Sequence, residues 1–153
     1  MPWMRHFTRS ALVAAPPARL FALINDVERY PAFVPWCVGS QVLSRTPTEV
    51  VATLEIKRSL LRTRFTTRNT LVEPDSVTMQ LVDGPFRSLE GTWTLTPIQD
   101  AAGTALGCRV TLDMRFEIAN ALTASLLEPV FEETVASLVE AFVARARATD
   151  ADG

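Results

Sequence analysis

A long stretch of this sequence alternates between apolar and polar residues, and that pattern constrains the fold more than any other feature. Six runs with a period of two cover 38–43, 49–57, 62–71, 77–82, 89–96 and 108–117. Short segments rich in turn-forming residues separate them, with turns expected at 46–48, 58–61 and 73–76. Successive short strands joined by tight turns favour an antiparallel sheet with one apolar face.

The N-terminal segment is predicted to add one strand and a short helix. Residues 3–14 form the strand, with Phe7 and Leu12 on its inner side, although the alternation is imperfect. A proline pair ends this strand, and Pro17 is well placed in the first turn of a helix over 17–24. Apolar residues recur at helical spacing there and predict one buried stripe.

A segment rich in proline and aromatic residues, 30–37, links this helix to the sheet. Residues 27–30 predict one more helical turn, which Pro31 is expected to end. The segment has too many prolines for a regular helix or central strand, and it is too apolar for a solvated loop. It is therefore expected to lie against the core or over the mouth of a cavity, and composition alone favours plain packing.

The C-terminal segment predicts one long helix over 121–148, followed by a frayed tail over 149–153. The sequence allows two positions for the start of this helix. Ser125 fits a capping box with the glutamate three residues later, whereas Asn120 as the cap leaves Pro129 inside the helix as a kink.

The order of these elements predicts how they pack. Only the C-terminal helix is long enough to cover the apolar face of the sheet. The predicted fold is α+β, a helix grip in which a curved antiparallel sheet of about six to seven strands holds the long helix. Two short helices follow the first strand, and a hydrophobic cavity is left between sheet and helix. Residues 1–148 are expected to form a single domain.

Composition narrows the class of protein. The 153 residues are 48% hydrophobic and 21% charged, which is typical of a globular chain. The net charge of −2 gives no general reason to expect a DNA partner or an anionic membrane. No signal peptide or membrane-spanning run is apparent. Cys37 and Cys108 lack a paired motif and are expected to be free, buried thiols in a reducing cytoplasm.

Catalytic and metal-binding patterns are weak. His6 is the only histidine, and nothing near it suggests a catalytic triad or a metal site. Glu55, Glu90 and Asp113 fall mostly on the polar side of their strands. We therefore predict no catalytic residue, no metal site and no required cofactor.

Three motifs give the chain a family resemblance. They are Tyr30-Pro-x-Phe33-x-Pro35-Trp36-Cys37, Asp83-Gly84-Pro85-Phe86 with Leu89, Gly91 and Trp93, and residues 126–146, which end Ala141-Phe142-x-x-Arg145-Ala146. With the order of elements, they make the chain similar to the START-like superfamily and, within it, to the coenzyme Q-binding protein family. Bacterial members of that family are labelled ribosome-association toxins and, more loosely, oligoketide cyclase or lipid-transport proteins. The resemblance runs over nearly the whole chain.

The resemblance implies a cavity for an apolar ligand, with ubiquinone or a similar isoprenoid lipid as the bound molecule. The candidate lining residues are Phe65, Met79, Trp93, Leu95, Leu112 and Met114 from the sheet, Phe131, Val135 and Leu138 from the helix, and Phe33, Trp36 and Phe86 at the entrance. A mixed aromatic and methionine lining suits such a ligand. For any one of these residues, simple core packing is the competing explanation.

A short basic segment suggests a second kind of partner. The residues are Lys57, Arg58, Arg62, Arg64 and Arg68, and the last three alternate onto one strand face. Such a face could meet ribosomal RNA or anionic lipid head groups. The alternative is a solvated face paired with Glu49, Glu55 or Glu90.

Two functions from different classes therefore remain. The first is a non-catalytic quinone- or lipid-binding protein that supports respiration. The second is a ribosome-association toxin that binds the large ribosomal subunit and blocks subunit joining. A polyketide cyclase activity is less favoured, but cyclases of this superfamily shape a reactive chain without a triad. Cytoplasmic location is expected in each case, and transient contact with the inner membrane surface and an antitoxin partner are left open.

Overall fold

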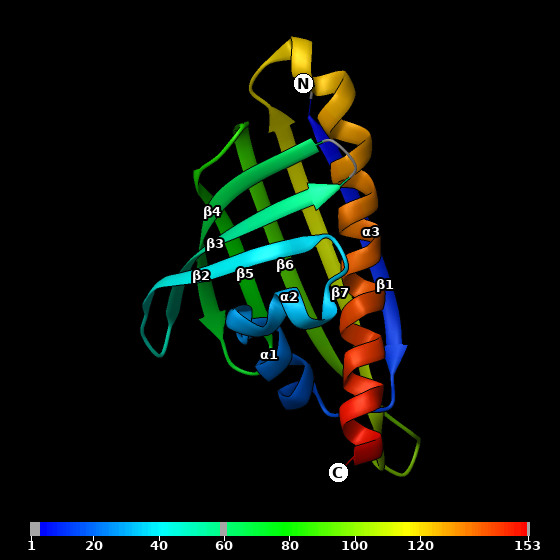
Figure 1. Ribbon diagram of the computed structural model, residues 1–153. Helices are drawn as coiled ribbons and strands as arrows, with labels where there is room; N and C mark the ends of the chain where they lie inside the picture. The colour runs from blue at the N-terminus through cyan, green and yellow to red at the C-terminus, as the bar shows by residue number, and fades with distance from the viewer. Residues whose placement is uncertain (1–3, 59–60, 153) are drawn as a thin grey trace.

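The computed structural model describes residues 4–58 and 61–152, and it shows one curved sheet, three short helical segments and one long helix (Figure 1). In chain order the elements are β1 (Arg5–Val13), α1 (Pro17–Asn25), the 3-10 helix η1 (Val27–Arg29), α2 (Tyr30–Phe33), β2 (Cys37–Arg45), β3 (Glu49–Arg58), β4 (Leu61–Val72), β5 (Ser76–Asp83), β6 (Phe86–Gln99), β7 (Ala105–Ile118) and α3 (Ala121–Asp152).

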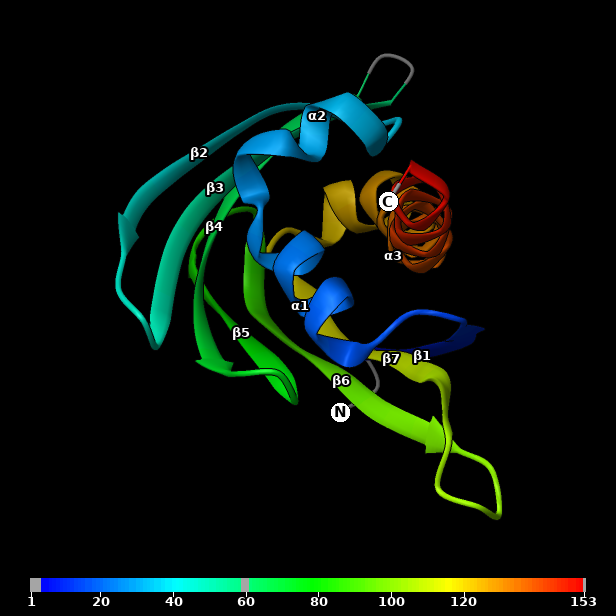
Figure 2. The ribbon, with the colours of Figure 1, turned by 90° about the horizontal axis from the view of Figure 1, so that it is seen from below.

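The seven strands form one antiparallel sheet in the order β1-β7-β6-β5-β4-β3-β2. Strands β2 to β7 follow one another as a meander, and β1 joins the far side by pairing with β7. Seen from below, the sheet bends into an arc, with α1, α2 and α3 on its concave side (Figure 2). The predicted helix-grip fold is confirmed.

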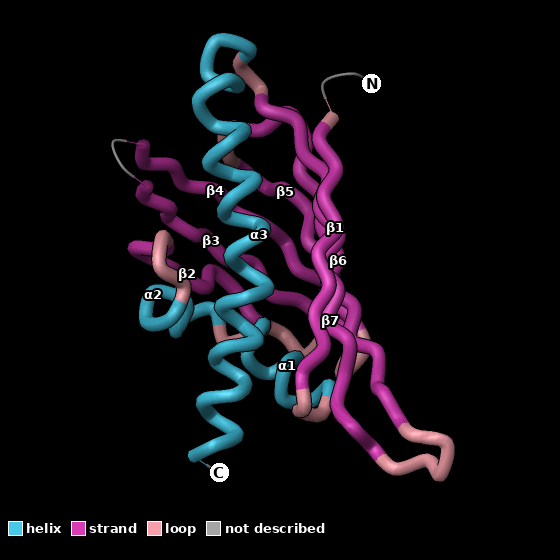
Figure 3. The backbone as a smooth tube through the Cα atoms, turned by 90° about the vertical axis from the view of Figure 1, so that its right-hand side faces the viewer, coloured by secondary structure: helices cyan, strands magenta, loops and turns pink. Residues whose placement is uncertain are grey.

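The alternation predicted from the sequence decides which residues face α3. In β7, Cys108, Val110, Leu112 and Met114 are buried, and the residues between them are more exposed. The long helix runs along the concave side of the sheet for most of its length (Figure 3). Its buried residues recur every three or four positions, as expected for one packed stripe: Phe131, Thr134, Val135, Val139, Phe142, Val143 and Ala146.

A cluster of aromatic rings fixes α3 to the sheet near the start of β6. Phe131 contacts Phe116 at 4.6 Å, Phe86 at 5.0 Å and Phe65 at 6.1 Å between ring centroids, each edge to face. Phe7 of β1 stacks on Phe116 at 5.8 Å between ring centroids. Such ring pairs stabilise packing beyond the area they bury, by about 0.5–1.5 kcal/mol each.

A second cluster fixes α3 eleven residues further along, which is about 16 Å at the helical rise. Phe142 contacts Phe33 at 5.2 Å, Trp93 at 5.2 Å and Tyr30 at 5.3 Å. The Arg145 guanidinium lies 5.4 Å from the centre of the Phe33 ring, in a cation–π contact. The aromatic segment predicted to cover the core therefore grips the C-terminal half of α3.

Two local predictions at the N-terminal end were wrong. Leu12 is 56% exposed, because it lies an odd number of residues from Phe7 and faces the opposite side of β1. Pro31 does not end a helical turn. It lies in the first turn of α2, where proline loses no hydrogen bond.

The boundaries of the longer elements also differ from prediction. Helix α3 begins at Ala121, so Pro129 lies inside it, and it continues to Asp152 instead of fraying from 149. Strand β6 extends through Pro97, where β5 no longer pairs with it and proline is tolerated. The predicted turn at 58–61 includes residues 59–60, which lie outside the described residues.

Replacing Phe142 tests the second aromatic cluster. Because Phe142 is fully buried among three rings, Phe142→Ala should lower the free energy of unfolding by about 3–5 kcal/mol. Urea denaturation measures the change. The exposed Glu140 on the same helix provides the control, and Glu140→Ala should change stability by less than about 0.5 kcal/mol. Equal effects of the two substitutions would contradict the packing described here.

Candidate functional site

A cavity lies between the two aromatic clusters, where α3 spans the concave face of the sheet. Its lining is mostly apolar and comes from β3 to β7, the η1–α2 segment and α3: Val27, Tyr30, Trp36, Ala52, Leu54, Phe65, Thr67, Asn69, Met79, Leu89, Trp93, Met114, Phe131, Thr134, Val135 and Leu138. Counted as the space open to the centre of a water-sized sphere, its volume is about 50 Å³. This is room for a few water molecules, so a larger ligand has to displace side chains.

The floor of the cavity consists of two flexible methionine side chains that lie over a glycine. Gly91 of β6 pairs with Met79 of β5 and Met114 of β7, and both methionine side chains fold over it. A Cβ atom at Gly91 would lie 2.8 Å from Met79 Cε and 2.8 Å from Met114 Sδ. The absence of a side chain at Gly91 therefore makes room for two long, flexible thioethers, which fill irregular gaps and adapt to ligands.

One wall of the cavity carries a small polar group. Thr67 and Asn69 lie two residues apart on β4, both are buried, and the Thr67 hydroxyl donates to Asn69 Oδ1 over 2.8 Å. Thr134 from α3 also lines the cavity, but its hydroxyl donates to the Val130 carbonyl over 2.8 Å. The Thr134 hydroxyl is thus already satisfied within the helix, and the Thr67–Asn69 pair is the stronger candidate for contact with a ligand.

Trp36 lines the cavity beside these residues and is 6% exposed. Its indole nitrogen is buried and has no hydrogen-bond partner among the described residues, and the same holds for the Ser40 hydroxyl. A buried donor left unpaired costs about 1–3 kcal/mol, so such a group needs an explanation. An acceptor brought by water or by a ligand would supply it.

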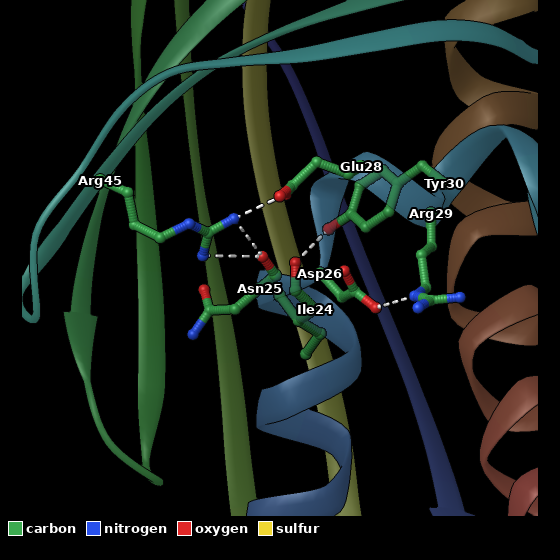
Figure 4. Close-up of polar contacts among 7 residues, drawn as sticks. All are labelled: Ile24, Asn25, Asp26, Glu28, Arg29, Tyr30 and Arg45. Carbon is green, nitrogen blue, oxygen red and sulfur yellow. Dashed lines mark hydrogen bonds and ion pairs between the residues drawn. The ribbon is translucent and has the colours of Figure 1, made fainter.

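The segment that carries Trp36 is anchored to the edge of the sheet by polar contacts (Figure 4). Arg45 of β2 pairs with Glu28 at 2.6 Å and donates to the Asn25 carbonyl over 3.3 Å. The buried Tyr30 hydroxyl donates to the Ile24 carbonyl. These contacts tie η1 and α2 to α1 and to β2, so the wall of the cavity formed by Val27, Tyr30 and Trp36 is held in place.

Most residues predicted to line the cavity do so. They are Trp36, Phe65, Met79, Trp93, Met114, Phe131, Val135 and Leu138. Phe33 instead packs on Phe142, and Phe86 lines a second, smaller cavity at the other aromatic cluster. Leu95 and Leu112 are buried in the core outside the lining. The predicted entrance formed by Phe33, Trp36 and Phe86 is therefore not assembled.

Sequence reasoning missed the polar part of the lining. Thr67 and Asn69 occupy the same face of β4 as Phe65, and this alternation was visible in the sequence. Residue type disfavours them as cavity residues, because polar side chains are usually solvated. The signal that could have found them is their position, because each lies an even number of residues from Phe65 and so faces the same side of the strand. Val27 and Tyr30 were missed because their positions depend on how η1 and α2 pack, whereas Leu89 shares its face of β6 with Trp93 and could have been found by alternation.

The predicted basic face is partly neutralised. Arg62 and Arg64 both pair with Glu55, the latter at 3.5 Å, and Arg68 pairs with Glu49 at 2.9 Å. The predicted carboxylate partners Glu49 and Glu55 are thus confirmed. Lys57 is exposed on the same convex face, which leaves two positive charges in excess over the two glutamates.

Arg58 is not part of this face. It has the parity of the inner residues of β3 and pairs with Glu133 of α3. The prediction that Arg58 belongs to the basic face was wrong, because the strand places it on the side that meets the helix. This contact and the pair of Arg5 and Glu128 at 2.7 Å are partly exposed ion pairs that link the sheet to the first half of α3.

The ionisable groups near the cavity are poor catalysts. Burial raises the pKa of the Cys37 thiol, which donates to the Gly39 carbonyl, so little reactive thiolate forms at neutral pH. Burial likewise raises the pKa of Tyr30. His6 lies 2.9 Å from Asp113 on the convex face, and its hydrogen bond lowers the pKa of that carboxyl. This pair is remote from the cavity.

Two further searches cover the described part of the chain. No three histidine, cysteine, aspartate or glutamate side chains gather there in a way that could hold a metal ion. None of the helices in residues 4–58 and 61–152 is long and apolar enough to cross a membrane. Both cysteines are free and buried, as predicted.

A family profile described as "Polyketide cyclase / dehydrase and lipid transport" matches residues 13–143. The chain belongs to this family. The match runs from the end of β1 to the last turns of α3, so it covers every wall of the cavity. Membership confirms the START-like resemblance inferred from the sequence motifs.

Curated relatives include ribosome-association toxins and a coenzyme Q-binding protein. "Ribosome association toxin RatA" of Pseudomonas aeruginosa is 42% identical, over 93% of this chain and 95% of that protein. The protein of the same name from Escherichia coli K12 is 38% identical, over 94% and 88%. "Coenzyme Q-binding protein COQ10 homolog B, mitochondrial" of Xenopus laevis is 27% identical, over 89% of this chain and 55% of that protein.

Solved structures share the fold at low identity. The ZhuI aromatase/cyclase from Streptomyces sp. R1128 superposes with a TM-score of 0.80 at 18% identity, over 94% of each chain. A START superfamily protein from Mycobacterium smegmatis superposes with a TM-score of 0.77 at 19% identity, over 94% of this chain and 98% of that one. These likenesses establish the architecture and leave the chemistry open.

Two glycine substitutions compare the movable floor of the cavity at Gly91 with the tight turn at Gly84, which packs against Phe65. Gly91→Ala should change the free energy of unfolding by no more than about 1 kcal/mol, because the new Cβ meets only the movable ends of two methionines. Gly84→Ala should cost more than about 2 kcal/mol. Its Cβ would lie 2.7 Å from Phe65 Cβ, and its φ is +153°. Thermal and urea denaturation measure both, and the reverse ranking would refute this account of the floor.

Proposed function

We propose that this protein is a non-catalytic carrier of an apolar ligand, with a quinone or similar isoprenoid lipid as the class that fits. The observation that carries the proposal is the largely apolar cavity between the sheet and α3. Its lining includes no aspartate, glutamate, lysine, arginine or histidine. A site of this composition holds an apolar molecule and offers little for acid–base or nucleophilic chemistry.

The size of the cavity sets a condition on this proposal. A volume of about 50 Å³ does not hold a quinone ring, so binding must open the site. The methionine floor over Gly91 supports such opening, because Met79 and Met114 can move without disturbing the backbone. A role in respiration would place delivery of the ligand at the inner membrane surface, by a protein of the cytoplasm.

Ligand retention tests the proposal directly. Organic extracts of the purified protein, analysed by mass spectrometry, should contain a quinone or other isoprenoid lipid in a defined ratio to protein. Gly91→Ala should retain several-fold less, because the displaced methionine side chains fill the space. The exposed substitution Glu140→Ala should retain as much as the unmodified protein. Extracts free of lipid, together with no uptake of added quinone, would remove this function.

Ribosome association is the second candidate, and the family relatives favour it. Proteins named for ribosome association are 38–42% identical over nearly the whole chain. The convex face supports the idea with Lys57, Arg62, Arg64 and Arg68, whose charge exceeds that of Glu49 and Glu55. Phosphates of ribosomal RNA would meet this excess. A toxin that blocks subunit joining, countered by an antitoxin, is the fuller form of this proposal.

Charge removal on the convex face tests the ribosomal role. The triple variant Arg62→Gln, Arg64→Gln and Arg68→Gln should reduce co-sedimentation with large ribosomal subunits at least tenfold, and the loss should shrink as salt rises. Glutamine avoids the repulsion that new carboxylates would suffer beside Glu55 and Glu49. The control removes three other exposed charges with Arg9→Gln, Arg109→Gln and Arg147→Gln. Unchanged sedimentation of the first variant would exclude the basic face as the contact with the ribosome.

A further inference from the structure

The two cavities beside α3 share part of their lining. The smaller one, of about 10 Å³, is lined by Ile56, Thr63, Pro85, Phe86, Ile118, Leu127 and Val130, together with Phe131 and Thr134. Phe131 and Thr134 also line the larger cavity. Both spaces therefore lie against the same turn of α3, and the Phe131 ring is a wall common to the two.

Contacts around Phe131 show what holds this wall. The ring packs edge to face on Phe65, Phe86 and Phe116, and it is 7% exposed. Pro129 lies two residues before it and cannot donate the helical hydrogen bond of its position. The ring is thus well packed, but it sits on a turn whose backbone ladder is interrupted. Displacing the ring would join the two cavities.

The polar group of the larger cavity is displaced from this wall along β4. Asn69 and Thr67 pair with Val50 and Ala52 of β3, whereas Thr63 of the smaller cavity pairs with Ile56. Six residues of β4 separate Asn69 from Thr63, which is about 20 Å in an extended strand. The combined space therefore has a polar side chain pair towards one end and is apolar towards the other.

The chemistry of the polar end limits the ligand. The carboxamide oxygen of Asn69 accepts from Thr67, which fixes the orientation of the amide, and the carboxamide nitrogen can donate a hydrogen bond to a ligand. The unpaired Trp36 indole nitrogen is a second donor in the same lining. No charged side chain lines either cavity. An ionised head group would be buried there without a counter-charge, which is strongly unfavourable.

From this arrangement we propose that the ligand is an uncharged, elongated amphiphile with a hydrogen-bond-accepting head at Asn69 and a chain that runs along β4 towards Phe131. Phe131 sets the chain length at which affinity stops rising, because a longer chain has to displace its ring. The inference rests on the proposed ligand-binding function and adds the charge, the orientation and the length limit of the ligand.

The test uses straight-chain 2-ketones of increasing length, which carry an acceptor and no charge, and which displace a neutral fluorescent naphthylamine from the full chain. Affinity of the unmodified protein should rise with chain length and then level off. Fatty acids of matched length should bind at least tenfold more weakly at neutral pH. Equal affinity for acids and ketones would overturn the proposal of an uncharged head.

Two substitutions test the two ends separately. Asn69→Leu should weaken ketone binding five- to tenfold and leave naphthylamine binding unchanged, since only the ketone loses its donor. If Asn69→Leu does not fold, Thr67→Val replaces it in this test, because it removes the hydrogen bond that orients the Asn69 carboxamide. Phe131→Ala should tighten only the ketones beyond the plateau, about tenfold, and so extend the length series.

Leu127→Ala is the matched control for Phe131→Ala, because Leu127 lines only the smaller cavity. It should leave the plateau where it is. Ketone binding that ignores both Asn69 and Phe131 would overturn this inference and leave the proposed function standing. If neither ketones nor naphthylamine bind the unmodified protein, the ligand-binding function fails and the inference fails with it.

Discussion

Edge-to-face packing of aromatic rings at two points on α3 is the interaction on which the rest of this structure depends. Phe131 meets the sheet through one set of rings and Phe142 through another. About 16 Å of helix lies between them, and there Thr134, Val135 and Leu138 face the sheet across a cavity. Large rings at both ends hold the helix away from the strands, so the smaller side chains between them do not close the gap.

The same arrangement leaves a cavity whose floor is made of movable side chains. Two methionines lie over a glycine at its floor, and each can be displaced at little cost to the backbone. The rigid parts of the wall are elsewhere, in the Arg45 and Tyr30 contacts that hold η1 and α2. Adaptation is thus confined to side chains, and the helix grip itself need not move far.

The two candidate functions use opposite sides of the sheet. The cavity lies on the concave side under α3, and the basic face lies on the convex side of β3 and β4. Strand alternation separates them, since neighbouring residues such as Phe65 and Arg64 face opposite ways. Substitutions on one side therefore leave the other intact. A protein that binds both a ligand and a ribosome would need no change of fold.

The sequence by itself determined the layers of this protein. Periods of two and of 3.6 assign each residue to a face, and they place Phe65, Met79, Trp93, Met114 and Phe131 towards the interior. The motif around Tyr30 and the long final helix were enough to indicate the family.

Only the tertiary structure decided which interior residues line a cavity and which fill the core. Leu95 and Leu112 have the same parity as the lining residues, yet they are packed on all sides. Phe33 and Phe86 belong to the clusters that end the cavity, and Arg58 turns to Glu133 instead of joining the basic face. The reason is physical. Alternation along a strand determines the face on which a side chain lies. A cavity depends instead on the distance between the sheet and α3, and that distance is set by the aromatic rings that meet between them.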